Sequence, residues 1–405
     1  MINATSQFDE APDDLAFEQD TDGAKPVVLI FKPDLLPYSE TFILEQARFL
    51  QRYRPVFVGL RRVPGLDIGD HEILNHGGHI GRLREYAYAW SGIAPDFLRR
   101  VARRRPALVH AHFGPSGVLA MPLCRRLGVP LVVSAWGYDV TVSDRELARG
   151  GYIGKIYVRR RKQLRRPHIQ HLAISRFMAE RLQSLGVSPR QITLHYAGID
   201  TERFQPSAQT DRENVALFVG RLVAKKGCEH LLAAMSRVQQ QLPEARLAII
   251  GDGPLRADLE RRANELGVVV EFLGAQPSDV VRDWMRRARV LCVPSITAPN
   301  GDSEGLPTVV IEAQACGLPV VGSRHAGIPE AVVDGETGFI ADERDVDGLT
   351  AGLRRLLTDH DLQRSFGQAA RDHVCRNFDI RRQSVRLERF YDSVRQAAAL
   401  GSPAG

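Results

Sequence analysis

Short apolar runs alternate with longer amphipathic segments along this chain of 405 residues, and after residue 214 the same alternation begins again. This arrangement is typical of repeated βα units, in which each apolar run forms a strand and the segment after it a helix. The runs are VVLIF, PVFVGL, LVHAHF, PLVVS, HLAIS and ITLHY in the first half, then VALFVG, RLAIIG, VVEFLG, VLCVP and PVVG. The pattern predicts an α/β protein with two Rossmann-like domains, each built on a doubly wound parallel sheet.

The polar stretch FQPSAQTDREN, residues 204–214, separates the two sets of repeats. We therefore expect an N-terminal domain over residues 25–208 and a C-terminal domain over residues 209–379. Residues 1–24 hold seven acidic residues, no basic residue and almost no apolar periodicity, so we expect a disordered tail there. Residues 380–405 begin with helical apolar spacing, and we expect this helix to cross back to the N-terminal domain.

The net charge of +6 is unevenly distributed. Residues 25–200 hold 28 Lys and Arg against 13 Asp and Glu, whereas residues 201–405 hold 26 against 28. We expect the basic N-terminal domain to face an anionic partner. Two basic runs, FLRRVARRR (97–105) and VRRRKQLRR (158–166), are either a solvated face or a membrane-binding surface, where each cation contributes about 1 kcal/mol. A nucleic-acid partner is disfavoured because no stacking aromatics accompany them.

The five cysteines are widely spaced and form no CxxC pair, which favours reduced thiols in a cytosol over a zinc or redox site. The sequence shows no N-terminal apolar segment of a secretion signal and no run of about 18 apolar residues that could cross a bilayer. We expect a cytoplasmic protein.

The segment GDSEGLPTVVIEAQACGLPVV, residues 301–321, is the strongest candidate for a ligand site. Gly305, Leu306 and Pro307 form a turn before a helix, and Pro307 suits the first helical position. The free amides from Thr308 onward then form an anion site of the kind that holds diphosphates.

Two carboxylates accompany this helix start. Glu304 precedes the turn, and Glu312 lies about 6 to 7 Å along the helix axis from its beginning, at ~1.5 Å per residue. The two can therefore address different parts of one ligand. Each acid alone would be read as a solvated loop acid or as a helix residue near the favourable dipole end.

The segment FVGRLVAKKG, residues 218–227, places Arg221 and Lys226 just after a strand, where two cations can stabilise a departing diphosphate. Lys225, between them, shows how easily a basic residue occurs there by chance. The glycine turn IIGDGP, with Gly251 and Gly253, is weak evidence for phosphate binding. Arg256 stands where GxGxxG needs its last glycine.

Together, GRLxxxKG, GDGP, FLG, SEGLPxxxxEAxAxGxPVV and AGIPE resemble retaining glycosyltransferase family 4 over nearly all of residues 25–395. The resemblance implies a GT-B fold, whose two domains face each other across a cleft. It also implies that Glu304 contacts the transferred sugar and that Glu312 binds the ribose. Arg221 and Lys226 would then hold the diphosphate without a metal.

The same resemblance places the nucleotide base near the backbone of Leu273 and Gly274, and it implies neither a cofactor nor a metal. The segment PDLLPYSETFILEQARFL resembles the bacterial exopolysaccharide branch of the family, which includes colanic acid and amylovoran enzymes. In that branch the loop with Ser39, Glu40 and Thr41 faces the interdomain cleft. These residues also suit a helix cap, and we keep both interpretations.

Trp136 in SAWGYDV stands where many relatives carry the histidine of His-Gly-x-Asp beside the donor sugar. Tryptophan accepts no proton, so that role is absent, moved, or replaced by stacking on a sugar face. A packed aromatic is the alternative. Asp139 either supports the cleft or caps a turn.

Two further patterns are read as structural. His110 and His112 lack an accompanying carboxylate or cysteine, which favours a strand end over a metal site. Asp345 and Asp347 precede a helix, which favours N-capping over metal binding.

We therefore expect a retaining, metal-independent transfer from a UDP- or GDP-sugar to a growing, lipid-linked bacterial exopolysaccharide or surface glycan. The protein would be associated peripherally with the inner membrane through its basic N-terminal domain. Two alternatives stay open: a nucleotide-sugar epimerase of the same fold, and a non-catalytic nucleotide-sugar-binding assembly protein.

Overall fold

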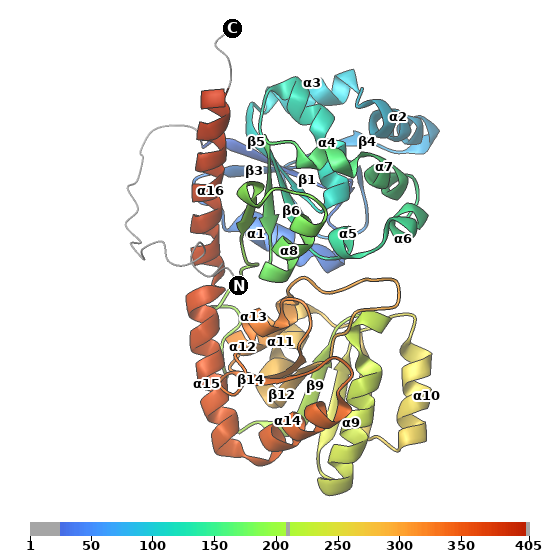
Figure 1. Ribbon diagram of the computed structural model, residues 1–405, viewed down its shortest axis with the longest axis vertical. Helices are drawn as coiled ribbons and strands as arrows, with labels where there is room; N and C mark the ends of the chain where they lie inside the picture. The colour runs from blue at the N-terminus through green and yellow to red at the C-terminus, as the bar shows by residue number, and fades with distance from the viewer. Residues whose placement is uncertain (1–24, 208–210, 402–405) are drawn as a thin grey trace.

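The computed structural model describes residues 25–207 and 211–401, apart from the side chain of Ser39. The predicted tail over residues 1–24 and the predicted boundary between residues 208 and 209 lie outside the described residues. Within them, the chain forms two parallel-sheet domains that lie one above the other along the long axis of the molecule (Figure 1).

The N-terminal domain has an eight-stranded sheet in the order β2-β3-β1-β5-β6-β7-β8, with β4 paired to β3. All its pairings are parallel. Its strands are β1 (Val27–Phe31), β2 (Asp34–Leu35), β3 (Arg54–Arg62), β4 (His71–Asn75), β5 (Pro106–His112), β6 (Leu131–Ala135), β7 (Ile169–Ala173) and β8 (Ile192–Leu194). Its helices are α1 (Thr41–Arg48), α2 (Gly78–Ser91), α3 (Pro95–Arg103), α4 (Gly114–Leu127), α5 (Tyr138–Thr141), α6 (Asp144–Arg149), α7 (Tyr152–Arg160) and α8 (Arg176–Ser184).

The C-terminal domain has a six-stranded parallel sheet in the order β11-β10-β9-β12-β13-β14. Its strands are β9 (Glu213–Val219), β10 (Arg246–Ile250), β11 (Val270–Gly274), β12 (Ala288–Val293), β13 (Val320–Ser323) and β14 (Gly338–Ala341). The helices are α9 (Cys228–Gln241), α10 (Arg256–Leu266), α11 (Ser278–Arg287), α12 (Thr308–Ala315), α13 (Ile328–Ala331), α14 (Val346–Thr358) and α15 (His360–Asn377), and α16 (Ile380–Gly401) follows them.

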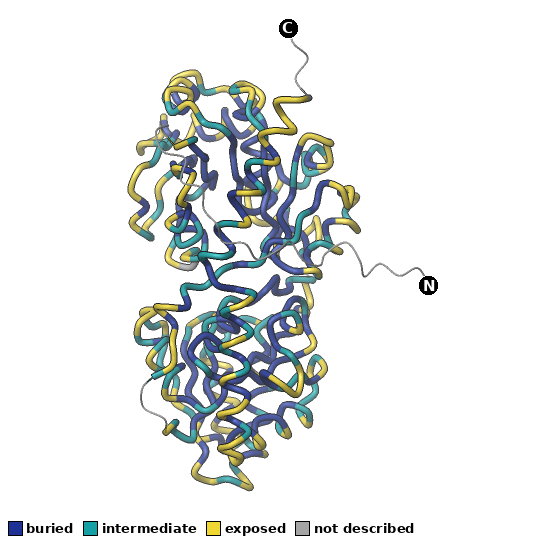
Figure 2. The backbone as a smooth tube through the Cα atoms, turned by 90° about the vertical axis from the view of Figure 1, so that its left-hand side faces the viewer, coloured by how far each residue is buried: buried dark blue, intermediate teal, exposed yellow. Residues whose placement is uncertain are grey.

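The predicted pair of doubly wound parallel sheets is confirmed. Every residue of β1 and β6 is buried, because helices cover both faces of the sheet. Alternate residues of β1 enter two different cores: Leu29 packs into one, and Val28 and Ile30 into the other. Figure 2 shows buried backbone inside each domain.

Three strands escaped the sequence analysis. β2 has only two residues, and β4 pairs with β3 alone and buries one residue fully. β14 has four residues and begins with Gly338. Because these strands are short or lie at the ends of the sheets, they lack the continuous apolar run that marks a central strand.

Two crossings of the chain between the domains lie side by side and are bonded to each other. Ile199 donates its amide to the Phe378 carbonyl at 2.8 Å, and Ile380 donates to the Ile199 carbonyl at 2.9 Å. These bonds form a short parallel bridge between Ile199 and Asp379. We call this two-stranded connection the crossing ribbon.

Helix α16 starts at the crossing ribbon and runs along the N-terminal domain (Figure 1). Its Glu388 is buried, and one carboxylate oxygen accepts the backbone amides of Gln51, Arg52 and Tyr53 at 2.7, 2.6 and 3.2 Å. Tyr391 of the same helix lies 2.6 Å from Nδ1 of His110. This last bond gives His110 the structural role expected of it.

Glu388→Ala is expected to lower the free energy of unfolding by about 3 kcal/mol, since three backbone amides, one of them buried, lose a charged acceptor. Glu388→Gln, which keeps an acceptor oxygen, should lose less. Urea unfolding followed by circular dichroism measures both. The matched control is Asp361→Ala on α15, an exposed carboxylate whose loss should change stability by less than about 0.5 kcal/mol. Equal effects of Glu388→Ala and the control would contradict the docking role of Glu388.

Candidate functional site

The loop Ser303–Gly305 of the C-terminal domain lies directly against the end of β6 in the N-terminal domain. The Ser303 amide donates to Oγ1 of Thr141 at 3.3 Å. A Cβ atom on Gly305 would clash with the Trp136 carbonyl oxygen and would lie 2.6 Å from Cδ1 of Ile174. Glycine is required here because the two backbones approach so closely. The predicted donor motif is therefore part of the contact between the domains.

Glu304 is buried at this junction, with its Oε1 3.1 Å from Nζ of Lys226 and 4.0 Å from Nζ of Lys225. Burial alone would raise the pKa of Glu304, but the charges of Lys226 and Lys225 outweigh it and hold the pKa below its ordinary value. Glu304 is therefore a carboxylate at neutral pH. The structure thus brings Lys226 and Glu304 together as an ion pair.

The backbone of Glu304 is held by a second pair of side chains. Its amide donates to Nε2 of His325 at 3.2 Å, and Nδ1 of His325 lies 2.6 Å from Oε1 of Glu343. Since Nε2 accepts, the ring proton is on Nδ1 and is donated to Glu343. Glu343 also accepts the Thr297 amide at 3.0 Å. These hydrogen bonds fix the position of the loop that contains Glu304.

Helix α12 begins at Thr308, so Pro307 is the residue before the helix. The prediction that Pro307 is the first helical residue is wrong. The backbone of Pro307 is extended, at φ −65° and ψ 116°, which leaves the first helical amide to Thr308. Glu312 lies one turn further and is partly buried. Burial raises its pKa to about 7, against the opposing effects of Thr308, Arg203 and Lys226.

Arg221 lies in the loop after β9 and is exposed. Within the described residues it forms no ion pair, so its charge is available to a ligand. The structure thus places Lys226 against Glu304 and leaves Arg221 open.

Gly251 and Gly253 bring the loops after β9 and β10 into contact. A Cβ on Gly251 would clash with the carbonyl oxygen of Gly220, and a Cβ on Gly253 would lie 2.5 Å from the carbonyl oxygen of Leu222. Gly251 also has φ +140° and donates its amide to the Gly274 carbonyl at 2.8 Å. Close packing alone therefore explains why glycine occupies both positions, without a bound phosphate.

The end of β11 is fixed by neighbouring side chains. The Leu273 carbonyl accepts from Nε2 of Gln276 at 2.6 Å. Arg256, in place of a third glycine, donates to the Phe272 carbonyl at 3.2 Å and lies over the Phe272 ring. The departure from GxGxxG thus serves the packing of this strand.

On the N-terminal side, the side chain of Glu40 faces Lys32 and forms no capping hydrogen bond. Its Oε1 accepts from Nζ of Lys32 at 2.7 Å, and Lys32 lies 4.4 Å from the centre of the Phe113 ring. Glu40 is the N-cap residue of α1, and its side chain accepts no capping bond; Thr41 is the first helical residue. The capping interpretation is therefore wrong for Glu40. Ser39 lies in the preceding 3-10 turn.

Trp136 is packed as an aromatic residue, with its ring centre 4.1 Å from that of Phe42. Its indole N–H donates to Nδ1 of His112 at 3.2 Å, so this donor is used inside the protein. Because Nδ1 of His112 accepts, the ring proton is on Nε2, a buried atom that forms no hydrogen bond within the described residues. Burial lowers the pKa of His112 well below its ordinary value and keeps the ring neutral.

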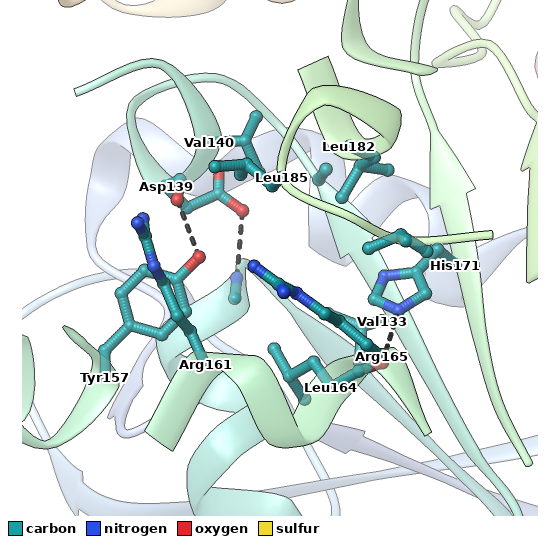
Figure 3. Close-up of a pocket in the computed structure, with 13 residues that line it drawn as sticks. Val133, Asp139, Val140, Tyr157, Arg161, Leu164, Arg165, His171, Leu182 and Leu185 are labelled. Atoms are coloured by element: carbon teal, nitrogen blue, oxygen red, sulfur yellow. Dashed lines mark hydrogen bonds between the residues drawn. The ribbon is translucent and has the colours of Figure 1, made fainter. Parts of the chain in front are cut away.

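Asp139 is fully buried behind the cleft wall, where it holds three backbone amides. It accepts from Gly114 at 2.9 Å, Gly137 at 3.0 Å and Trp136 at 3.3 Å. Burial raises its pKa to about 6 in spite of these bonds. Figure 3 shows the side chain among the residues that line a small pocket. The turn-supporting role is the one this geometry provides.

The sequence analysis missed four residues that the structure places at or near the site. Lys225, taken as a chance neighbour, bonds Asp302 at 3.1 Å and lies near Glu304. Lys32 and His325 carried no signal, because a lone basic residue has no pattern. Glu330 belongs to the AGIPE motif and accepts a hydrogen bond from the amide of Arg176, at the start of α8, at 2.8 Å. This hydrogen bond joins the two domains. Asp345 caps α14 through the Gly348 amide at 2.9 Å, as predicted.

Comparison with known proteins identifies the family. The model "Glycosyltransferase Family 4" matches residues 22–203, and the model "Glycosyl transferases group 1" matches residues 199–373. The putative colanic acid biosynthesis glycosyltransferase WcaL of Salmonella typhimurium is 35% identical over 292 residues, which are 68% of this chain and 69% of that protein. The chain belongs to glycosyltransferase family 4.

Other relatives and solved structures agree with this family 4 assignment. A GDP-mannose-dependent alpha-(1-6)-phosphatidylinositol monomannoside mannosyltransferase of Mycolicibacterium smegmatis is 32% identical, over 73% of this chain and 81% of that protein. The crystal structure of Anabaena HepE in complex with UDP has a TM-score of 0.72 at 18% identity, over 91% of this chain and all of that one. The fold of this glycosyltransferase is GT-B. None of its described helices has the length and apolar character needed to span a bilayer.

Gly305→Ala is expected to lower both stability and transfer, since the added Cβ pushes the donor loop away from the Trp136 carbonyl. Overpacking of this kind costs about 1 to 3 kcal/mol. Thermal unfolding and a nucleotide-release assay measure the two effects. The control is Gly150→Ala, at φ −70°, where a Cβ would meet only the Leu147 carbonyl at 3.2 Å. If Gly305→Ala matched the control in both assays, the close approach would not matter.

Proposed function

We propose that this glycosyltransferase transfers a sugar, with retention and without a metal, from a UDP- or GDP-sugar to a lipid-linked bacterial exopolysaccharide or surface glycan at the cytoplasmic face of the inner membrane. The observation that carries the proposal is the buried, ionised Glu304 held by Lys226 beside the start of α12. A carboxylate, a cation and free helix amides in one place suit a sugar joined to a diphosphate.

Each donor-site residue has one task in this scheme. Glu304 accepts hydrogen bonds from the sugar, and Glu312 accepts them from the ribose. Arg221 and Lys226 stabilise the negative charge that develops on the leaving diphosphate. The bond from the anomeric carbon to the diphosphate breaks and the bond to the acceptor oxygen forms on the same face. The acceptor proton passes to the leaving phosphate oxygen.

The names of similar proteins support the donor and acceptor classes. Anabaena HepE has been crystallised with UDP and with UDP-glucose, and the mycobacterial relative is named for GDP-mannose. Relatives from Salmonella and Erwinia are named for colanic acid and amylovoran biosynthesis. Both donor bases and a polysaccharide acceptor are therefore represented among them.

The test is a donor screen with the purified protein and membrane extract as the source of acceptor. Release of nucleoside diphosphate from one UDP- or GDP-sugar should depend on the extract and should survive EDTA. Arg221→Ala should lower kcat/KM by a factor that corresponds to about 2 to 4 kcal/mol of transition-state stabilisation, and the control Arg262→Ala on α10 should leave kcat/KM unchanged. A strict need for added divalent metal contradicts the mechanism. Donor conversion without acceptor would indicate an epimerase, and binding without release a scaffold.

The two carboxylates should differ in what they control. Glu304→Ala should mainly lower turnover, whereas Glu312→Ala should weaken donor binding by about 2 kcal/mol. Since the pKa of Glu312 is about 7, this side chain is protonated below neutral pH and ionised above it, so donor affinity should rise from pH 6 to pH 8. Glu312→Gln should flatten that rise.

Calorimetry with the intact nucleotide-sugar measures these affinities, because free diphosphates titrate a terminal phosphate near pH 6. An unchanged affinity and turnover in both alanine variants would remove the donor-site assignment.

A further inference from the structure

Helix α2 (Gly78–Ser91) presents its large apolar side chains to solvent. Nine large apolar side chains are exposed in the described part of the chain, and five of them belong to this helix and its C-terminal end. Ile80 and Leu83 are each 69% exposed, and Trp90 is 45% exposed. Tyr86 and Ile93 complete the set. Scattered exposed leucines are ordinary, but a contiguous group marks an interaction surface.

The inner face of α2 is already packed against its own domain, where Tyr88 belongs to the buried hydrophobic core and Glu85 is held by hydrogen bonds. Glu85 is buried there, 2.9 Å from Nη1 of Arg61, and accepts from the hydroxyl of Tyr152 at 3.1 Å. Tyr88, also buried, donates to the Leu119 carbonyl at 3.0 Å. Rolling the helix to bury its apolar side would break these bonds. Its orientation is therefore fixed with Leu83 and Trp90 outward.

Two arginines border the apolar residues. Arg82 and Arg84 precede and follow Leu83, and at about 100° per residue they point to opposite sides of it. Both are exposed, and neither forms an ion pair within residues 25–207 and 211–401. Asp96, an exposed acid near Arg84, pairs with Arg99. The neighbouring helix α7 adds the exposed Lys155 and Arg159.

We propose that the α2 face, made of Ile80, Leu83, Tyr86, Trp90 and Ile93 with Arg82 and Arg84 at its margins, inserts into the interface of an anionic lipid bilayer. The inference builds on the proposed membrane attachment of the N-terminal domain and names the surface that makes it. Apolar side chains enter the acyl boundary, aromatic rings lie at headgroup level, and the arginines bind lipid phosphates.

A lipid surface fits this face better than a protein does, because its charge is complementary on both margins. The domain holds 28 Lys and Arg against 13 Asp and Glu over residues 25–200. Figure 1 places α2 on the side of the domain opposite to α16.

The run over residues 158–166, the earlier candidate for membrane binding, is partly used inside the protein. Arg160 donates to the carbonyls of Ala89 and Trp90 at the end of α2, at 3.3 and 2.5 Å. Arg161 lies 2.6 Å from Asp144. Of the three arginines at 159–161, Arg159 alone forms no ion pair or hydrogen bond in the described structure. Charge reversal of all three would disturb the support of α2 together with any lipid contact.

The experiment is co-sedimentation of the full chain with vesicles of neutral phosphatidylcholine and of phosphatidylcholine with phosphatidylglycerol. Binding should increase with the anionic fraction, and Leu83→Glu/Trp90→Glu should reduce it by about tenfold or more. Arg82→Glu/Arg84→Glu should reduce it and remove most of its salt dependence. The matched control is Val269→Glu, which changes an apolar residue 61% exposed in the C-terminal domain and should bind as the unchanged protein does.

Depth is measured separately with lipids brominated along the acyl chain. The protein has three tryptophans, and Trp90 is the exposed one on α2. Bromine quenching should be present in the unchanged protein and lost in Trp90→Phe, a variant that still binds vesicles. Quenching that persists in Trp90→Phe would place another tryptophan at the membrane and overturn the assignment.

Two further outcomes would also overturn it. The first is equal vesicle binding by the double glutamate variant and Val269→Glu. The second is a change of the double variant from dimer to monomer in sedimentation equilibrium without a change in lipid binding, which would make the α2 face a contact between copies. Donor affinity, measured by calorimetry without vesicles, tests the proposed function separately, and it should be the same in all these variants.

Discussion

Burial of the Glu304 carboxylate at the junction of the two domains is the constraint from which the rest of the site follows. Removing a carboxylate from water costs several kcal/mol unless charges and hydrogen bonds compensate for it. Lys226 and Lys225 provide the charges, and His325 holds the backbone. The glycine that follows lets the loop approach the neighbouring domain. The residues of the motif thus share one physical explanation. Each of them either stabilises the buried carboxylate of Glu304 or lets the backbones of the two domains approach closely.

The site consequently belongs to both domains, although the donor residues are on one. The loop before α12 bonds to Thr141, and Glu330 at the end of the AGIPE motif holds the start of α8. One hydrophobic core contains residues from both sides, including Ile174 and Leu306. An arrangement of this kind makes the position of the donor loop depend on how the domains meet. On the N-terminal side, the indole N–H of Trp136 is likewise held by a specific hydrogen bond, to His112.

Sequence patterns predicted the fold better than the site. Central strands of a covered parallel sheet must be apolar throughout. For this reason runs such as VVLIF could be recognised in the sequence, whereas the short edge strands β4 and β14 could not. The Glu304 and Glu312 pair was visible because the motif is long. Lys225 was not, since its importance comes from Glu304, which is far away in the chain. Lys32 was not either, because its pairing with Glu40, eight residues further on, follows no recognisable spacing. The basic runs misled in part, because composition does not tell whether an arginine faces lipid or a carbonyl.

The crossing ribbon has a mechanical consequence. Two separate linkers would let the domains swivel about two independent points. Here the two crossings are bonded to each other through Ile199, Phe378 and Ile380, and Thr201 bonds to Asp379 beside them. The two crossings therefore cannot shift past each other without breaking the hydrogen bonds that join them, so a movement of one domain relative to the other must move both crossings together.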